Sequence, residues 1–221
     1  MLFRSNVFVD TEKETYFLLA ALNSKISNYI FKCLNPTVNK QAGDLKRLPY
    51  SDKGEKPFFC VSQKAEVCVK IKHKVCSFSL LESNFSKSPI ASAKDQNIKQ
   101  KIKDHLNFEN LLLSQILINE AIINEEIFKT YDLTEHDKAM VLAKEGESIG
   151  NLPVIPEAQN AYLSEFEATK GLLLDDSREF IEALPTKELT AEEREAIEHG
   201  FESLYQSNND LEEFCIRHQV N

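Results

Sequence analysis

Amide and basic side chains are concentrated between Lys25 and Arg47, with little acid among them. Side chains of these two kinds bind phosphates and read the edges of bases. The candidate nucleic-acid contacts are Lys25, Asn28, Asn35, Asn39, Lys40, Lys46 and Arg47. The same spacing also fits a basic helix face followed by a polar loop that only meets solvent, and the residue types alone fit both interpretations equally.

The cysteines and histidines lack the spacing of a metal site. Cys60, Cys68 and Cys76 are eight residues apart, whereas zinc ligands usually pair with about two to four residues between them. No two of the five histidines are four residues apart. Adjacent acids such as Asp175 and Asp176 would point about 100° apart on a helix. We therefore expect free thiols, solvated acids, no metal and no catalytic residue.

The net charge of −9 hides a division of the chain. Residues 1–103 contain 18 Lys and Arg against 9 Asp and Glu, and the totals of 26 and 35 leave 8 basic and 26 acidic residues for the rest. The first part therefore carries +9 and the second −18. A phosphate backbone is attracted to the first part and repelled by the second. Alternatively, each part is simply solvated by its own charges.

The composition is that of a globular protein, with 42% hydrophobic and 28% charged residues among 221. No segment is apolar enough for a membrane helix, and residues 1–10 do not resemble a signal peptide. Five cysteines cannot all pair, and reduced thiols are typical of the cytoplasm. We expect a cytoplasmic protein with no membrane partner.

Hydrophobic periodicity predicts a mainly α protein in which a small α+β patch at the N-terminus precedes a long-helix bundle. Residues 3–9 favour a short strand, and a helix over 15–34 should end at Asn35-Pro36. Extended or turning chain should follow as far as Pro49. We expect a basic segment at 1–90, resembling a target-recognition region, and an acidic helical region at 91–221.

Further helices are predicted over 59–75, 91–129, 134–146 and 157–184, with irregular chain over 77–89. The Val and Cys content of residues 59–75 also fits a strand. Two more helices should begin at Thr190 and at Ser207 or Asn208, where capping residues stand. Two apolar stripes mark the 91–129 helix, which suggests burial on a broad face. The first is Ile98, Ile102, Leu106, Leu113 and Leu117, and the second is Leu112, Ile116, Ile123 and Ile127.

Several short motifs together resemble one protein family. They are Leu22-Asn23-Ser24-Lys25, Asn35-Pro36-Thr37, Gly43-Asp44-Leu45, the run 137–154, and the C-terminal runs 183–194 and 204–221. This pattern is similar to the target-recognition and C-terminal region of large bacterial adenine-specific DNA methyltransferases of the BREX phage-defence type (PglX-like). Type IIG restriction–modification enzymes carry looser versions. The family usually has tryptophans near residues 73–85, where this chain has none.

The resemblance implies a DNA-recognition role without catalysis in this part of the protein. The parent's N-terminal methyltransferase domain would bind S-adenosylmethionine and methylate adenine, so no cofactor is expected here. That chemistry needs a glycine-rich loop and an Asn/Asp-Pro-Pro-Tyr/Phe tetrapeptide for the flipped base. The nearest match, Asn35-Pro36-Thr37-Val38, lacks the second proline and the aromatic. The expected partners are double-stranded DNA, the methyltransferase domain and other defence-system proteins.

A second interpretation belongs to another class of function. The acidic half is also typical of a helical scaffold that docks partner subunits of the same system, and both roles are compatible with one chain.

Overall fold

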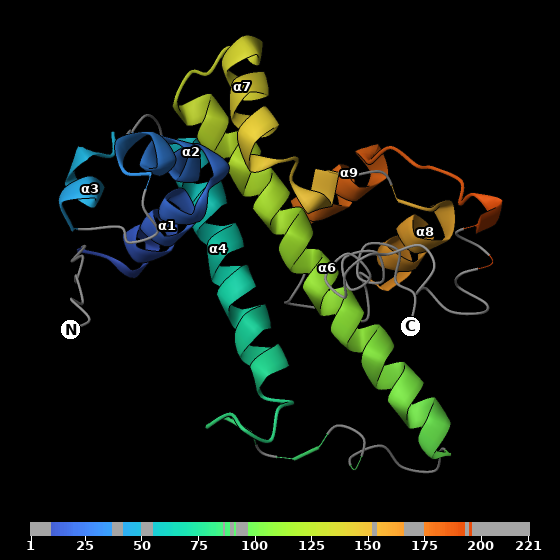
Figure 1. Ribbon diagram of the computed structural model, residues 1–221. Coiled ribbons are helices and arrows are strands. Elements are labelled where there is room, and N and C mark those ends of the chain that lie inside the picture. The colour runs from blue at the N-terminus through green and yellow to red at the C-terminus, as the bar shows by residue number, and fades with distance from the viewer. Residues whose placement is uncertain are drawn as a thin grey trace. The chain divides into compact units, whose positions relative to one another are not determined.

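The computed structural model describes residues 10–36, 42–49, 55–85, 87–88, 91, 97–151, 154–165, 175–192 and 195. Within these ranges the chain is mostly helical, which confirms the mainly α prediction (Figure 1). The helices are α1 Glu12–Asn23, α2 Lys25–Leu34, α3 Ala42–Arg47, α4 Glu55–Cys76, α6 Ile98–Thr130, α7 Glu135–Glu145, the 3-10 turn η1 Ile149–Asn151, α8 Pro156–Glu165 and α9 Asp175–Ala183. Strand-like pairing among the described residues is limited to a parallel bridge between Val154 and Thr186.

The N-terminal region contains two helices where one was predicted over 15–34. Thr11 opens α1 with a capping box that includes Glu14. Ser24 then has an extended backbone, and its side chain accepts a hydrogen bond from the backbone N–H of Ser27. The Ser24 hydroxyl also donates to the carbonyl of Ala21 at 2.7 Å. One serine therefore ends α1 and caps α2, because its side chain replaces the backbone bonds that a continuous helix would make.

The expected mixed patch at the N-terminus is not supported. Residues 42–47, predicted to be extended or turning, form α3, and α1 and α2 precede it. The predicted strand over 3–9 lies outside the described residues. Local composition was a poor guide here because α3 is a short helix held by contacts with other elements, described below.

The described chain divides into two compact units. Unit 1 comprises residues 1–66 and 119–148. Its core joins α1, α2, the first half of α4, the end of α6 and α7, through residues that include Phe17, Ile26, Val61, Ile127 and Val141. Unit 2 comprises residues 67–118 and 149–221. It has a separate core of Val67, Ile71, Leu112 and Ile116. The predicted division between residues 90 and 91 stays a prediction.

The helices predicted over 59–75 and 134–146 are confirmed as α4 and α7. Thr134 and Asp137 form a capping box at the start of α7, and Gly146 ends it with a φ of 73°. The helix predicted over 91–129 corresponds to α6, which begins at Ile98. Residues 77–85 form turns, as predicted.

The single helix predicted over 157–184 is wrong. Gln159 Nε2 in α8 donates to the carbonyl oxygen of Ile181 in α9 at 2.8 Å. In one continuous helix these residues would lie about 33 Å apart at 1.5 Å per residue. Helices α8 and α9 therefore pack side by side. Apart from 191, 192 and 195, which are helical, the helices predicted from Thr190 and from Ser207 or Asn208 fall outside the described residues.

Only one of the two predicted stripes on α6 is fully buried. Leu112, Ile116, Ile123 and Ile127 are at most 6% exposed. In the other stripe Ile98 is 69% exposed, and Ile102 and Leu106 are each 40% exposed. In the turn after α4, Leu80 and Leu81 are also exposed, at 77% and 94%.

Among the helices that the structure describes, none combines the length and the apolar character needed to cross a membrane.

Candidate nucleic-acid interface

Helix α3 carries two of the predicted contact residues and is anchored on both sides. Asn35, which follows α2, donates from Nδ2 to Asp44 Oδ2 at 2.9 Å, and Asp44 is only 9% exposed. Beyond α3, the Tyr131 hydroxyl donates to the carbonyl oxygen of Pro49. Asn35 is thus a positioning residue, since its side-chain amide binds the Asp44 carboxylate of α3.

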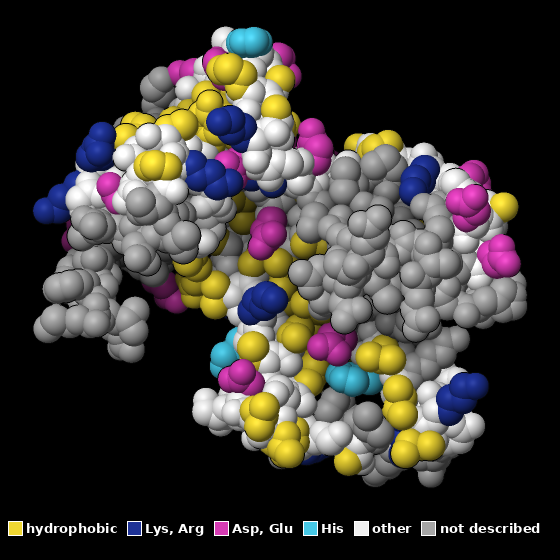
Figure 2. Space-filling view, viewed as in Figure 1, with side chains coloured by type: hydrophobic (Ala, Val, Ile, Leu, Met, Phe, Trp, Pro, Cys, Tyr) yellow, Lys and Arg dark blue, Asp and Glu magenta, His cyan; other side chains and the backbone are white. Residues whose placement is uncertain are grey.

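Lys46 and Arg47 stand in the last turn of α3, and both side chains are exposed. Neither makes an ion pair with a described residue. In Figure 2 dark blue side chains stand at the edge of the surface over α3. An exposed guanidinium and ammonium held on an anchored helix can contact phosphate oxygens without first breaking an internal bond.

Lys25 is engaged inside unit 1. Its backbone N–H donates to Asn124 Oδ1 at 2.8 Å, and its Nζ donates to the carbonyl oxygen of Glu145 at 3.0 Å. That carbonyl belongs to the last turn of α7, where unpaired carbonyl groups and the helix dipole favour a cation. The ammonium of Lys25 therefore caps the C-terminal end of α7.

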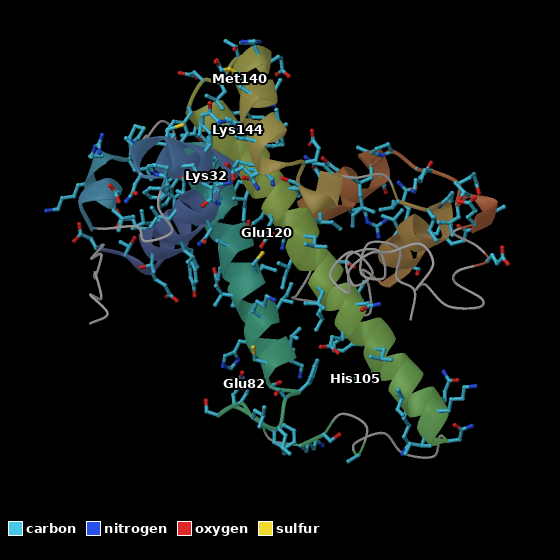
Figure 3. All side chains as sticks on the ribbon, in the orientation of Figure 1. Lys32, Glu82, His105, Glu120, Met140 and Lys144 are labelled. Carbon is cyan, nitrogen blue, oxygen red and sulfur yellow. The ribbon has the colours of Figure 1, made fainter. Side chains whose placement is uncertain are left out.

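Lys32, labelled in Figure 3, also contacts α7. Its Nζ lies 2.7 Å from Glu145 Oε2. The Glu145 side chain is 8% exposed and that of Lys32 is 62% exposed. Removing the cation from a nearly buried carboxylate destabilises a protein more than breaking an ion pair at the surface does. Lys25 and Lys32 together thus hold α2 against α7, a pairing between residues more than a hundred positions apart that no sequence signal indicates.

The remaining predicted residues are spread over several settings. Asn28 donates from Nδ2 to the carbonyl oxygen of Asn23 at 3.5 Å, the limit for a hydrogen bond. Asn39 and Lys40 lie outside the described residues. The structure therefore places Lys46 and Arg47 together at one surface, while Lys25 and Asn35 make structural bonds.

Two side chains near the start of α7 have shifted pKa values. Hydrogen bonds from the Thr134 side chain and backbone lower the pKa of Asp137. The hydrogen bond to Glu125 raises the pKa of Lys138, and the Lys138 Nζ to Glu125 Oε2 distance is 2.8 Å. Both shifts accompany contacts that fix the start of α7 and involve none of the predicted contact residues.

The cysteines and acids form no metal centre in the described part of the chain. Cys33, Cys60, Cys68 and Cys76 are not joined in disulfides. No group of three or more His, Cys, Asp or Glu side chains is close enough there to hold an ion.

Comparisons with family models, with curated proteins and with solved structures find no match to this chain.

Proposed function

We propose that this chain recognises and holds double-stranded DNA as part of an adenine-specific, S-adenosylmethionine-dependent DNA methyltransferase of a phage-defence or restriction–modification system. The observation that carries the proposal is the exposed cationic end of α3, with Lys46 and Arg47 available on a helix anchored through Asp44. The excess of positive charge over residues 1–103 supports it. The methyl transfer itself belongs to a catalytic domain elsewhere in the parent protein.

The anchoring explains what α3 does in this proposal. Phosphate contacts fix the register of a protein on the duplex only if the cations themselves are held in place. The Asn35–Asp44 hydrogen bond fixes the start of α3 relative to α2. A duplex bound by Lys46 and Arg47 would then be oriented relative to the whole of unit 1.

The test is a fluorescence-anisotropy titration of a labelled duplex at about 50 mM salt. Reversing both charges in Lys46→Glu/Arg47→Glu should weaken binding by about 2 kcal/mol or more, roughly thirtyfold, because each lost contact at 4 Å in water is worth about 1 kcal/mol. The control is Lys129→Glu/Lys144→Glu, which makes the same change in net charge at two exposed lysines of unit 1, of which Lys129 is paired with Glu126. Equal affinities of the two variants would rule out α3 as the interface.

The scaffold interpretation is retained because of the exposed stripe Ile98, Ile102 and Leu106. These residues follow each other at four-residue spacing on one side of α6, flanked by Lys99 and Lys101. A helix with an apolar face and acidic flanks would fit such a stripe. Replacing Ile102 and Leu106 with Ser would then abolish partner binding without changing DNA affinity, which separates the two functions.

A further inference from the structure

The C-terminal half of α4 presents a second cationic surface, on unit 2. Four of the five residues from Lys70 to Lys74 are basic or histidine, namely Lys70, Lys72, His73 and Lys74, and all four are exposed. No Asp or Glu occurs between Val67 and Leu81. This set, termed here the α4 cationic face, is separate from the Lys25–Arg47 stretch in sequence.

The four side chains share the solvent side of the helix with Val69, which is 39% exposed, and with half-buried Glu66 one turn earlier. At about 100° per residue they spread over roughly 200° of its circumference. The opposite side holds Val67 and Ile71, which are 6% and 0% exposed in the core of unit 2. The face is therefore presented by a helix whose rotation about its own axis is set by burial.

The end of α4 is also held in place. Asn84 in the following turn donates from Nδ2 to the carbonyl oxygen of His73 at 2.9 Å, which satisfies one of the carbonyl groups that a helix end leaves unpaired. Phe78 lies 5.0 Å from the His105 ring and 6.2 Å from Phe108 of α6, and the Lys74 ammonium stands 5.4 Å above the Phe78 ring. Glu82 of the same turn and His105 are labelled in Figure 3.

Interaction with the helix dipole does not account for this face. The dipole effect acts within the last turn, and only His73 and Lys74 lie there. Lys70 and Lys72 come before it. Lysine is also depleted from the buried centres of protein–protein interfaces, whereas phosphate backbones are bound chiefly through Lys and Arg. The chemistry favours a polyanion over a protein partner.

We propose that the α4 cationic face is a second contact for the phosphate backbone of double-stranded DNA. This inference rests on the proposed function, because it takes DNA as the polyanion. Contacts of this kind are independent of base sequence, so the face adds affinity and salt dependence while leaving the choice of target to other residues.

The experiment measures how affinity for a labelled duplex changes with salt, using the full chain. Each phosphate contact contributes about −0.9 to the slope of log K against log salt for duplex DNA. Lys72→Gln/Lys74→Gln should therefore make the slope shallower by about 2 and weaken binding several-fold at about 50 mM salt. Lys72→Arg/Lys74→Arg should retain the wild-type slope, because the charges remain.

The control is Lys129→Gln/Lys144→Gln, which removes two positive charges from exposed sites outside the face. It should leave the slope unchanged. Circular dichroism melting of each variant verifies folding, since a merely structural role of Lys72 or Lys74 would change melting and not the slope.

The outcomes are distinct for the two proposals. If Lys46→Glu/Arg47→Glu loses binding while Lys72→Gln/Lys74→Gln keeps the wild-type slope, the α4 proposal falls and the proposed function stands. If the wild-type chain fails to bind duplex at low salt, both fall. A shallower slope with the Gln variant, restored by the Arg variant, supports the α4 contact.

Discussion

Gly150 lies in η1, where the structure leaves no room for a methyl group. A Cβ built on Gly150 would be 2.3 Å from the carbonyl oxygen of Leu117, 2.7 Å from its carbonyl carbon and 2.8 Å from the Cα of Ile118. All three atoms belong to the backbone of α6. Since ordinary contact begins near 3.4 Å, η1 and α6 would have to separate by about 1 Å.

Gly150→Ala should therefore destabilise the protein strongly. Overpacking of this kind typically costs about 1–3 kcal/mol, and we expect about 3 kcal/mol because helix backbone moves less easily than a side chain. For a chain of this size that corresponds to a fall in melting temperature of roughly 6–12 °C. The measurement is urea and thermal unfolding followed by circular dichroism.

Gly43 provides the control. A Cβ at this exposed position in α3 meets nothing within 4 Å, and replacing glycine by alanine inside a helix gains roughly 0.5–1 kcal/mol. Gly43→Ala should thus be neutral or slightly stabilising. If Gly150→Ala unfolds at the same urea concentration as the wild type, the close approach of η1 to α6 described here is incorrect.

Three further results are expected. Thr134→Ala should lower the free energy of unfolding by about 1 kcal/mol through loss of the helix cap. The folded-state pKa of Asp137 is lowered, so the stability that its carboxylate contributes is present above the unfolded pKa and is lost as pH falls through the folded pKa. The difference in unfolding free energy between wild type and Thr134→Ala should therefore shrink in acid. A difference that grows in urea titrations at acidic pH would contradict this. Lys25→Met should reduce stability by about 1 kcal/mol while leaving the salt slope of DNA binding unchanged, because its ammonium is bound to the Glu145 carbonyl; a reduced slope at unchanged stability would instead make it a DNA contact. Calorimetric titration with S-adenosylmethionine should give no binding heat, and a clear micromolar isotherm would refute a role confined to recognition.

Elements with local signals were predicted well from the sequence. The helix predicted over 134–146 matches α7 almost to the residue, because the cap at Thr134 and the positive φ of Gly146 that the structure shows there each act within one turn. The apolar positions of α4 predicted a helix for the same reason, since its periodicity is a property of neighbouring turns.

The residues selected as candidate contacts have different settings in the structure. Lys46 and Arg47 were selected because they lie in a stretch rich in basic and amide side chains, and both are exposed on α3. No feature of residue type or spacing separates them from Lys25, whose carbonyl partner is 120 residues away. A lysine that binds a helix end and a lysine that meets solvent look identical until the chain folds.

By itself the sequence determined a mainly helical chain, the start and end of α7 and the separation of charge between its parts, because these depend on near neighbours or on composition alone. Tertiary structure decided the rest. Ser24 divides α1 from α2, and Gln159 bonds across to α9. Ile98, with the same apolar character as the buried Leu112, stays exposed. Burial and pairing depend on which elements meet, and that is a property of the whole packed chain.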